Sequence, residues 1–426
     1  MDIYKDNIDF LSPVWTRIFP IVADRAEGSY IYATDGRMYL DFTCGIGVTN
    51  TGHCHPAVVA AIREQAGLFL HAQANIVIHQ PMLKLIAELR QVVPSSINSF
   101  FFSNSGAEAI EGAVKLARAA TGKTNIIVFS GSFHGRTAGT MALTTSKTIY
   151  RSGFQPLPAG VFVAPFPYAY KLGMNDEQAT EYCLSALEEL LLSQTSPAET
   201  AAILIEPVLG EGGYVVPPAS FMTGLRKLAD ANGILLILDE IQSGFGRTGK
   251  WFALEHFGVA PDIMTVAKGI ASGLPLSGVF SSKEIMKKWQ TGSHGGTYGG
   301  NVLACAAGVA TIRAMKKEKM IDNASRRGVQ LMSGLRKLQE QYPTIGDVRG
   351  LGLMIGTELS DAKGKPAEKK VTKAIVHACE DRNLLLLSCG TYDNVIRWIP
   401  PLIVNEAQIN EALDIFGEAL KEVTGQ

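Results

Sequence analysis

The stretch ILLILDEIQSGFGRTG, residues 234–249, decides the fold class of this chain. Its opening residues are apolar throughout rather than alternating, which is typical of a strand covered on both faces of a sheet. The strand ends in Asp239, and downstream DIMTVAKGIASGLPLSG, residues 262–278, ends another apolar strand in Lys268. In an open α/β sheet, ligands bind outside the carboxyl ends of the strands, so these two ends are where we expect the chemistry of this chain.

Apolar strands and helical periods alternate on both sides of this stretch. The β-α-β rhythm predicts a parallel, right-handed doubly wound sheet covered by helices. SYIYATDGRMYLDF, near the front, predicts a hairpin that turns at Asp35 and Gly36. The expected strands are 98–102, 125–129, 161–164, 201–205, 234–238, 263–267 and 276–281, and the expected helices are 56–70, 80–92, 106–120, 178–192 and 219–232.

From about residue 302 the pattern changes and predicts a smaller α+β domain. The expected elements are two long helices over 302–342, short strands over 345–359, a charged helix over 366–382, strands around 384–399 and a final helix over 406–422. The expected division is an N-terminal segment (1–55) that packs with the small domain, a large domain (56–310) and a C-terminal small domain (311–426).

Composition excludes several classes of protein. Lys and Arg number 39 against 40 Asp and Glu, so the net charge of −1 favours neither nucleic acid nor an anionic membrane. The start, MDIYKDNIDF, has no basic region followed by an apolar one, and no apolar stretch is long enough to span a bilayer, so we expect a cytoplasmic protein. The six cysteines form no CxxC pair and His53, Cys54 and His55 lack zinc spacing, so we expect neither a disulfide framework nor a metal site.

Asp239 and Lys268 together indicate a cofactor. An acid that holds a pyridinium nitrogen and an amine that bonds to the aldehyde carbon are the two protein groups that pyridoxal 5'-phosphate needs. A buried carboxylate without a cation tends to protonate, so Asp239 should have a positive partner. A loop-capping carboxylate and a solvated lysine are the alternative interpretations, and the position of Lys268 relative to Asp239 favours the cofactor.

Two other strand ends carry residues suited to the same cofactor. In FFFSNSGAEAIEGAVKLARAATG, the small residues Ser105, Gly106 and Ala107 at a helix start would let backbone N–H groups approach a phosphate. An ordinary Ser-capped helix is the alternative.

In VFSGSFHGRT, Phe133 and His134 follow the strand and precede Arg136. The Phe133 ring is suited to stack on a flat cofactor, and Arg136 to bind a substrate carboxylate. A core phenylalanine and a surface ion pair are the alternatives. Gln242, after Asp239, would contact the phenolic oxygen of the ring.

These segments, in this order, resemble the class III, or ω-, aminotransferases of the fold type I pyridoxal phosphate enzymes, and among them the 4-aminobutyrate aminotransferases most. The resemblance runs nearly end to end, through DGRMYLDFTCGIGVTNTGHCHP, SNSGAEA, FHGRT, IEPVLGEGG, LDEIQSGFGRTG, AKGIASGLPLSG, GGTYGGN and SCGTYDNVIRWIPPL. It implies a large domain with a mostly parallel mixed sheet sandwiched by helices, and a small α+β domain built from the N- and C-terminal segments.

The resemblance also implies roles in cofactor binding. Lys268 would bond to the cofactor and move a proton between it and the substrate carbon, while Asp239 would keep the ring nitrogen protonated. Thr297 would reach the phosphate of the neighbouring subunit, so the implied enzyme is a homodimer or a dimer of dimers. The other residues assigned to the cofactor are Ser105, Gly106, Ala107, Phe133, His134 and Gln242.

For the substrate, the resemblance places Ile46 and Arg136 at the far carboxylate of an ω-amino acid. Glu211 and Arg397 would form a switch in which Glu211 masks the arginine until the α-carboxylate of glutamate displaces it. A structural salt bridge is the alternative for this pair. Cys44 departs from the glycine often found in the family, and Phe133 from the tyrosine of some relatives.

The expected reaction is a ping-pong transfer of an amino group from 4-aminobutyrate, or a similar ω-amino acid, to 2-oxoglutarate, which gives the semialdehyde and L-glutamate. An ornithine or acetylornithine aminotransferase would share the cofactor residues. An amino acid epimerase or aminomutase of the same fold would need no 2-oxo acid, and a non-enzymatic binding protein would not need Lys268.

Overall fold

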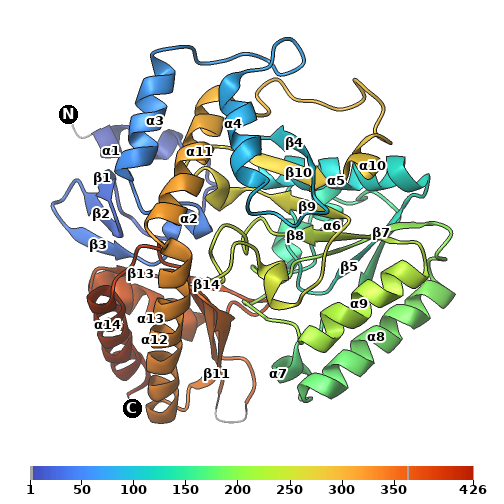
Figure 1. The fold of residues 1–426 in the computed structure, drawn as a ribbon. Coiled ribbons are helices and arrows are strands. Elements are labelled where there is room, and N and C mark those ends of the chain that lie inside the picture. Colours follow the sequence, from blue (N-terminus) through green and yellow to red (C-terminus); the bar gives the residue numbers. More distant parts are fainter. Residues whose placement is uncertain (1–2, 362–363, 426) are drawn as a thin grey trace.

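The structure is a computed structural model that describes residues 3–361 and 364–425. A seven-stranded sheet forms its centre, in the order β4-β10-β9-β8-β7-β5-β6 (Figure 1). Its strands are β4 (Ser99–Ser103), β5 (Asn125–Phe129), β6 (Val161–Ala164), β7 (Thr200–Ile205), β8 (Leu235–Asp239), β9 (Ile263–Val266) and β10 (Ser277–Ser281).

One strand of this sheet, β10, runs against the others. It pairs antiparallel with both β4 and β9, whereas the remaining pairs are parallel. The parallel pairing expected from the β-α-β rhythm does not extend to β10, and the mostly parallel mixed sheet implied by the family resemblance is confirmed. The physical reason is the short connection 267–276, since a parallel crossover needs a dozen or more residues.

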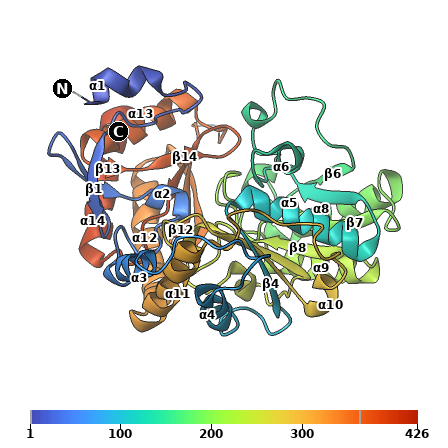
Figure 2. The same ribbon diagram turned by 90° about the horizontal axis from the view of Figure 1, so that it is seen from above.

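Helices cover both faces of the sheet (Figure 2). In β5, Ile126 and Val128 pack with α5 on one face, whereas Ile127 and Phe129 belong to the core with α8 and α9 on the other. This alternation is the period of two expected for a strand buried on both faces. The helices before β11 are α1 (Ile3–Asn7), α2 (Cys44–Gly47), α3 (Pro56–Ala66), α4 (Gln80–Leu89), α5 (Gly106–Thr121), α6 (Ala138–Leu143), α7 (Ala169–Leu172), α8 (Asp176–Ser193), α9 (Ala219–Ala231), α10 (Lys283–Met286), α11 (Val302–Lys317) and α12 (Met320–Gln341).

The C-terminal part contains a four-stranded sheet in the order β11-β12-β15-β14, and α12 packs against β11. Arg397, one of the predicted substrate residues, lies on its strand β15. The elements are β11 (Ile345–Leu351), β12 (Met354–Leu359), α13 (Lys369–Asp381), β13 (Leu384–Leu385), β14 (Leu387–Cys389), β15 (Val395–Trp398) and α14 (Glu406–Thr424).

The two ends of the chain share a second four-stranded sheet, β1 (Ala23–Glu27), β2 (Tyr30–Ala33), β3 (Met38–Asp41) and β13. The predicted hairpin is confirmed, because β2 and β3 pair antiparallel. β3 also pairs in parallel with β13, Leu40 opposite Leu384. The division into domains at 55 and 310 stays a prediction. Within the described part of the chain, none of the helices combines the length and apolarity that a bilayer-spanning segment needs.

Candidate active site

A cavity of about 490 Å³ lies at the carboxyl ends of the central strands. Nearly all of the residues predicted for the site line it, since strands that run in one direction bring their ends to one edge of the sheet. The predicted residues in its wall are Ile46, Ser105, Gly106, Ala107, Phe133, His134, Arg136, Glu211, Asp239, Gln242 and Lys268.

Lys268 begins a short 3-10 turn (Lys268–Ile270) directly after β9. Its φ of 49° lies in the left-handed region, which a residue with a side chain adopts only when its surroundings hold it there. Burial lowers the pKa of Lys268 to about 8, although the negative charges of Glu211, Asp239 and Glu206 act to raise it. About a tenth of this amine is therefore uncharged and nucleophilic at pH 7, far more than for an ordinary lysine.

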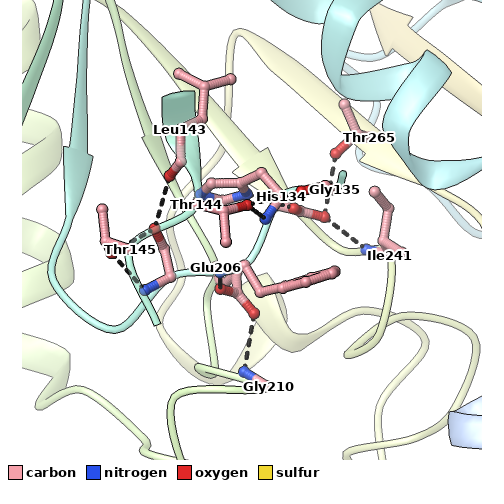
Figure 3. Close-up of polar contacts among 12 residues, drawn as sticks. His134, Gly135, Leu143, Thr144, Thr145, Glu206, Gly210, Ile241 and Thr265 are labelled. Carbon is pink, nitrogen blue, oxygen red and sulfur yellow. Dashed lines mark hydrogen bonds and ion pairs between the residues drawn. The ribbon is translucent and has the colours of Figure 1, made fainter. Parts of the chain in front are cut away.

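Asp239 ends β8, is 4% exposed and has a histidine as its partner. His134 Nδ1 lies 2.7 Å from Asp239 Oδ2, while Ile241 N and Thr265 Oγ1 donate to Asp239 Oδ1 (Figure 3). His134 Nε2 is buried without a partner among the described residues. The carboxylate is thus held in one orientation at the cavity wall by three groups.

The start of α5 has a capping box that leaves its first amides to the cavity. Ser105 Oγ accepts from Glu108 N at 3.3 Å, and Glu108 Oε2 accepts from Ser105 N at 2.8 Å. Among the described residues no acceptor is assigned to the N–H groups of Gly106 and Ala107, which lie in the first turn, where a helix offers no partner of its own. Both the Ser-capped helix and the anion-binding helix start, which the sequence posed as alternatives, fit this arrangement.

The middle of the cavity offers two apolar walls and an unpaired amide. Phe133 and Ile241 both line it, and Gln242 Oε1 is buried without a partner among the described residues. A Cβ on Gly106 would come within 3.0 Å of Ile241 Cδ1, so a larger residue there would have to displace the Ile241 side chain. Ile241 carried no predicted role, although it lies between two residues that did.

Ile46 and Arg136 lie at the outer end of the cavity. Ile46 is 40% exposed and has a φ of 66°, a conformation that turns the loop after Thr43 back on itself. The Arg136 guanidinium lies 4.9 Å from the centre of the Tyr150 ring and 5.8 Å from that of Phe133. Among the described residues no carboxylate is within ion-pair distance of Arg136, so the surface ion pair considered as its alternative is not formed. Tyr150 is a further residue that sequence reasoning missed.

Glu211, in the cavity wall, and Arg397, which does not itself line the cavity, form the ion pair that the family resemblance implied. Arg397 is 5% exposed, and its NH1 donates to Glu211 Oε1 at 2.5 Å. Burial by itself would raise the pKa of Glu211, but the Arg397 guanidinium outweighs that effect and holds this pKa below its ordinary value. Arg397 Nε is buried and has no partner in the described part of the chain, so the guanidinium retains a donor for another carboxylate.

Thr297 lies outside this cavity. It is exposed, in the loop 287–301 between α10 and α11. The role in a neighbouring subunit that the resemblance implied is therefore not tested within one chain.

Glu206 is an additional acid in the cavity wall, just beyond the end of β7 and only 6% exposed. Its two carboxylate oxygens accept from Phe133 N and from Gly210 N, each at 2.8 Å (Figure 3). Burial raises the pKa of the Glu206 carboxyl above its ordinary value. Glu206 lies in IEPVLGEGG, one of the stretches that carry the family resemblance. No local sequence pattern shows that its side chain binds the backbone of two separate loops.

A family model described as aminotransferase class-III matches residues 11–420. The chain belongs to this family, whose members depend on pyridoxal phosphate, and the protein is an aminotransferase. It is 42% identical over 410 residues to the 5-aminovalerate aminotransferase DavT of Pseudomonas aeruginosa, with 96% of this chain and 95% of the relative covered. It is also 42% identical over 408 residues to the 4-aminobutyrate aminotransferase GabT of Escherichia coli, with 95% of each covered.

A solved structure of an amine transaminase from an uncultivated Pseudomonas species, in a form with pyridoxal phosphate bound, is similar to the whole fold. The TM-score is 0.90 at 30% sequence identity, and 97% of each chain is covered. The family resemblance and the fold type I architecture predicted from the sequence are thereby confirmed.

Proposed function

We propose that this aminotransferase transfers the amino group of an ω-amino acid, with 4-aminobutyrate as the best candidate, to 2-oxoglutarate. The products of this ping-pong reaction are the semialdehyde and L-glutamate. The observation that carries the proposal is the buried Arg397, which pairs with Glu211 of the cavity wall, while Arg136 of the same wall has no carboxylate partner among the described residues. Two arginines, one masked and one open, suit a site that binds substrates with one and then two carboxylates.

The residues of the cavity fit pyridoxal phosphate. The free amides of Gly106 and Ala107 suit the phosphate, and Phe133 and Ile241 suit the two faces of the ring. The unpaired Gln242 Oε1 marks a place for a polar group of a ligand. When bound, the cofactor supplies an electron sink for the bond broken at the substrate carbon.

The proposed chemistry of the protein groups follows from their positions. Asp239, oriented by His134, would stabilise a positive charge on the ring nitrogen of the bound cofactor. Lys268 Nζ holds the cofactor between reactions and moves the proton at the substrate carbon during them. Its lowered pKa suits both tasks, because an amine that titrates near pH 8 exchanges protons readily at neutral pH.

Two arginines would bind the carboxylates of the substrates, Arg136 in the cavity wall and Arg397 beside Glu211. Arg136 binds the far carboxylate against Ile46, so that the amine is directed towards Lys268. With an ω-amino acid bound, Glu211 neutralises Arg397. When glutamate binds, Glu211 withdraws and Arg397 takes the α-carboxylate, aided by the donor at Nε that the structure leaves unpaired.

Arg136→Ala should raise the KM for 4-aminobutyrate by about 10- to 100-fold, because one charge-assisted contact is worth roughly 1.5–3 kcal/mol. The KM for simple amines, which lack the carboxylate, should change little. Steady-state rates on 4-aminobutyrate and on an aliphatic amine measure the difference. Equal losses on both donors would remove the carboxylate role of Arg136.

Cofactor uptake should depend on pH through Lys268. Only the neutral amine is a nucleophile, so the rate at which the apoprotein takes up added pyridoxal phosphate should rise about tenfold per pH unit below pH 8 and level off above it. Stopped-flow absorbance between pH 6 and 9.5 measures this. An increase that continues towards pH 10.5 would show that Lys268 titrates as an ordinary lysine.

We propose that the enzyme is a homodimer, or a dimer of dimers, with its active site at the subunit interface. Several large apolar side chains in the loop after α3 are exposed, among them Leu68 at 70%, Ile76 at 79% and Ile78 at 69%, and Tyr298 beside Thr297 is 62% exposed. Such a group of apolar side chains marks an interaction surface, and a second copy of this chain would cover it. The cytoplasmic location stays a prediction.

The absorption spectrum of the purified protein tests the proposed function. A visible band from the lysine-bound cofactor should bleach on addition of 4-aminobutyrate alone and return on addition of 2-oxoglutarate. If the band is unchanged by 4-aminobutyrate but bleaches with ornithine or acetylornithine, 4-aminobutyrate is not the donor and the protein is still an aminotransferase. Product formed from one amino acid with no 2-oxo acid present would indicate an isomerase of the same fold.

A further inference from the structure

The turn that carries Glu211, residues 210–213, is held at several points along its backbone. Glu206 Oε2 accepts from Gly210 N at 2.8 Å at its start. Glu211 O accepts from Gly390 N at 2.9 Å, and Gly210 O accepts from Gly213 N at 3.1 Å. A Cβ on Gly212 would collide with Gly131 O, so the turn is also packed closely against a neighbouring loop.

The far end of the turn is bound by Arg349, a residue of β11 that does not line the cavity. Arg349 donates two hydrogen bonds to Gly213 O, from NH2 at 2.7 Å and from Nε at 3.1 Å. Gly213 has a φ of 122°, which only glycine adopts without strain, and a Cβ there would approach Arg349 NH2 within 3.2 Å. Residue 213 is therefore shaped to receive the guanidinium.

Arg349 is itself held rigidly by its surroundings. Its NH1 lies 2.6 Å from Asp347 Oδ2 and 2.8 Å from Glu358 Oε2, and its side chain is 12% exposed. The guanidinium also packs on the Tyr168 ring, 4.8 Å from its centre, and the Tyr168 hydroxyl donates to Glu358. With both carboxylates at NH1, the Nε and NH2 edge remains directed at the turn.

We propose that Arg349 is a positioning residue that fixes the backbone of the 210–213 turn, so that Glu211 leaves Arg397 by rotation of its side chain alone. The inference rests on the proposed function, in which Glu211 must alternate between two positions. A backbone bound at Gly210, Glu211 and Gly213 cannot swing as a loop, whereas the Glu211 side chain, 12% exposed at the cavity wall, has room beside it. Arg349 thereby sets how well Glu211 masks Arg397 without touching either substrate.

The substitution Arg349→Lys tests this role. Lysine keeps the positive charge beside Asp347 and Glu358 but lacks the fork that binds Gly213 O twice. Arg226→Lys is the matched control, because Arg226 also binds two carboxylates, Asp230 at 2.6 Å and Asp262 at 2.8 Å, and is similarly buried with a 17% exposed side chain. Asp262 precedes β9, at the opposite edge of the sheet from the cavity.

The first readout is the ratio of kcat/KM for the 4-aminobutyrate half-reaction to that for the L-glutamate half-reaction. A loosened turn leaves Arg397 partly unmasked, which harms the ω-amino acid but not glutamate, so Arg349→Lys should lower the ratio about tenfold. Arg226→Lys should leave the ratio unchanged. Equal losses in both half-reactions of Arg349→Lys would mean a merely structural arginine and would overturn the inference.

The second readout is hydrogen exchange of the peptide 207–216 in the apoprotein, which depends on neither substrate nor turnover. Its amides should exchange at least about tenfold faster in Arg349→Lys than in the wild type or in Arg226→Lys. Unchanged exchange would overturn the inference even if the wild type proved not to use 4-aminobutyrate. If the proposed function were wrong, the wild type itself would show it, because its half-reaction with 4-aminobutyrate would not proceed.

Discussion

The Lys268→Ala protein should fold normally and lose turnover by at least about 10⁴-fold. Lys268 is proposed both to hold the cofactor and to move the proton at the substrate carbon, and general acid–base catalysis alone accounts for about 10²–10⁴-fold. Removal of the side chain also removes a charge that burial disfavours, as the lowered pKa of Lys268 indicates. The melting temperature of the variant should therefore be no lower than that of the wild type.

Turnover and thermal unfolding of the purified variant measure this pair of expectations. Lys283, exposed at the start of α10, provides the control, since Lys283→Ala removes a lysine far from the cavity and should leave both quantities unchanged. Lys268→Arg keeps a positive charge but offers no amine that can bond to the cofactor, and it should be as inactive as Lys268→Ala. Substantial turnover by either Lys268 variant would refute the role given to this residue.

The Asp239→Asn protein should lose about 10²–10³-fold in kcat, with equal losses for every amino donor. The change is isosteric and leaves an oxygen to accept from Ile241 N and Thr265 Oγ1, so the fold should persist. What it removes is the negative charge that we propose for the ring nitrogen of the bound cofactor, in a site where Asp239 is only 4% exposed and electrostatic stabilisation is strong.

Rates on 4-aminobutyrate and on a simple amine, together with the amount of cofactor retained after gel filtration, test the role of Asp239. Asp230→Asn, which alters an exposed carboxylate paired with Arg226, is the control and should retain full activity. A loss confined to donors that carry a carboxylate would instead place Asp239 in substrate recognition.

The strand ends that hold the site were predictable from the sequence because burial on both faces leaves a simple pattern. β8 and β9 were expected at 234–238 and 263–267 and are found at Leu235–Asp239 and Ile263–Val266. The end of such an apolar run marks the end of the strand, and the residues there lie at the carboxyl edge of the sheet, where ligands bind. The apolar pattern does not show that β10 runs antiparallel to its neighbours, because a strand has the same apolar content in either direction.

The end of helix α3 and the presence of strand β1 could not be predicted, because the apolar or charged character of a residue does not by itself show whether that residue is buried. The helix expected over 56–70 ends at Ala66, and the apolar Leu68, Phe69 and Leu70 that prolonged the pattern are exposed rather than buried. β1 was missed because its sequence, ADRAE, is charged and mostly exposed, as an edge strand can be.

The positioning residues of the site were missed for a further reason. Glu206 and Arg349 act through hydrogen bonds to backbone atoms of Gly210 and Gly213, and a backbone acceptor or donor leaves no residue type to recognise. Tyr150 likewise matters only through its ring contact with Arg136. Such partners become visible only when distant segments are brought together.

The pairing of β3 with β13 bears on how the chain is completed during synthesis. Leu40 N donates to Asn383 O at 2.8 Å and Phe42 N donates to Leu385 O at 3.1 Å, so the edge of the β2–β3 hairpin stays unpaired until residues that follow the whole central sheet in the chain have been synthesised. Because chains emerge from the ribosome with the N-terminus first, the seven-stranded sheet is fully synthesised while this edge is still open. β13 thus completes a sheet that β1, β2 and β3 began, and a ribosome that stops before β13 releases a chain with an unpaired strand edge at β3.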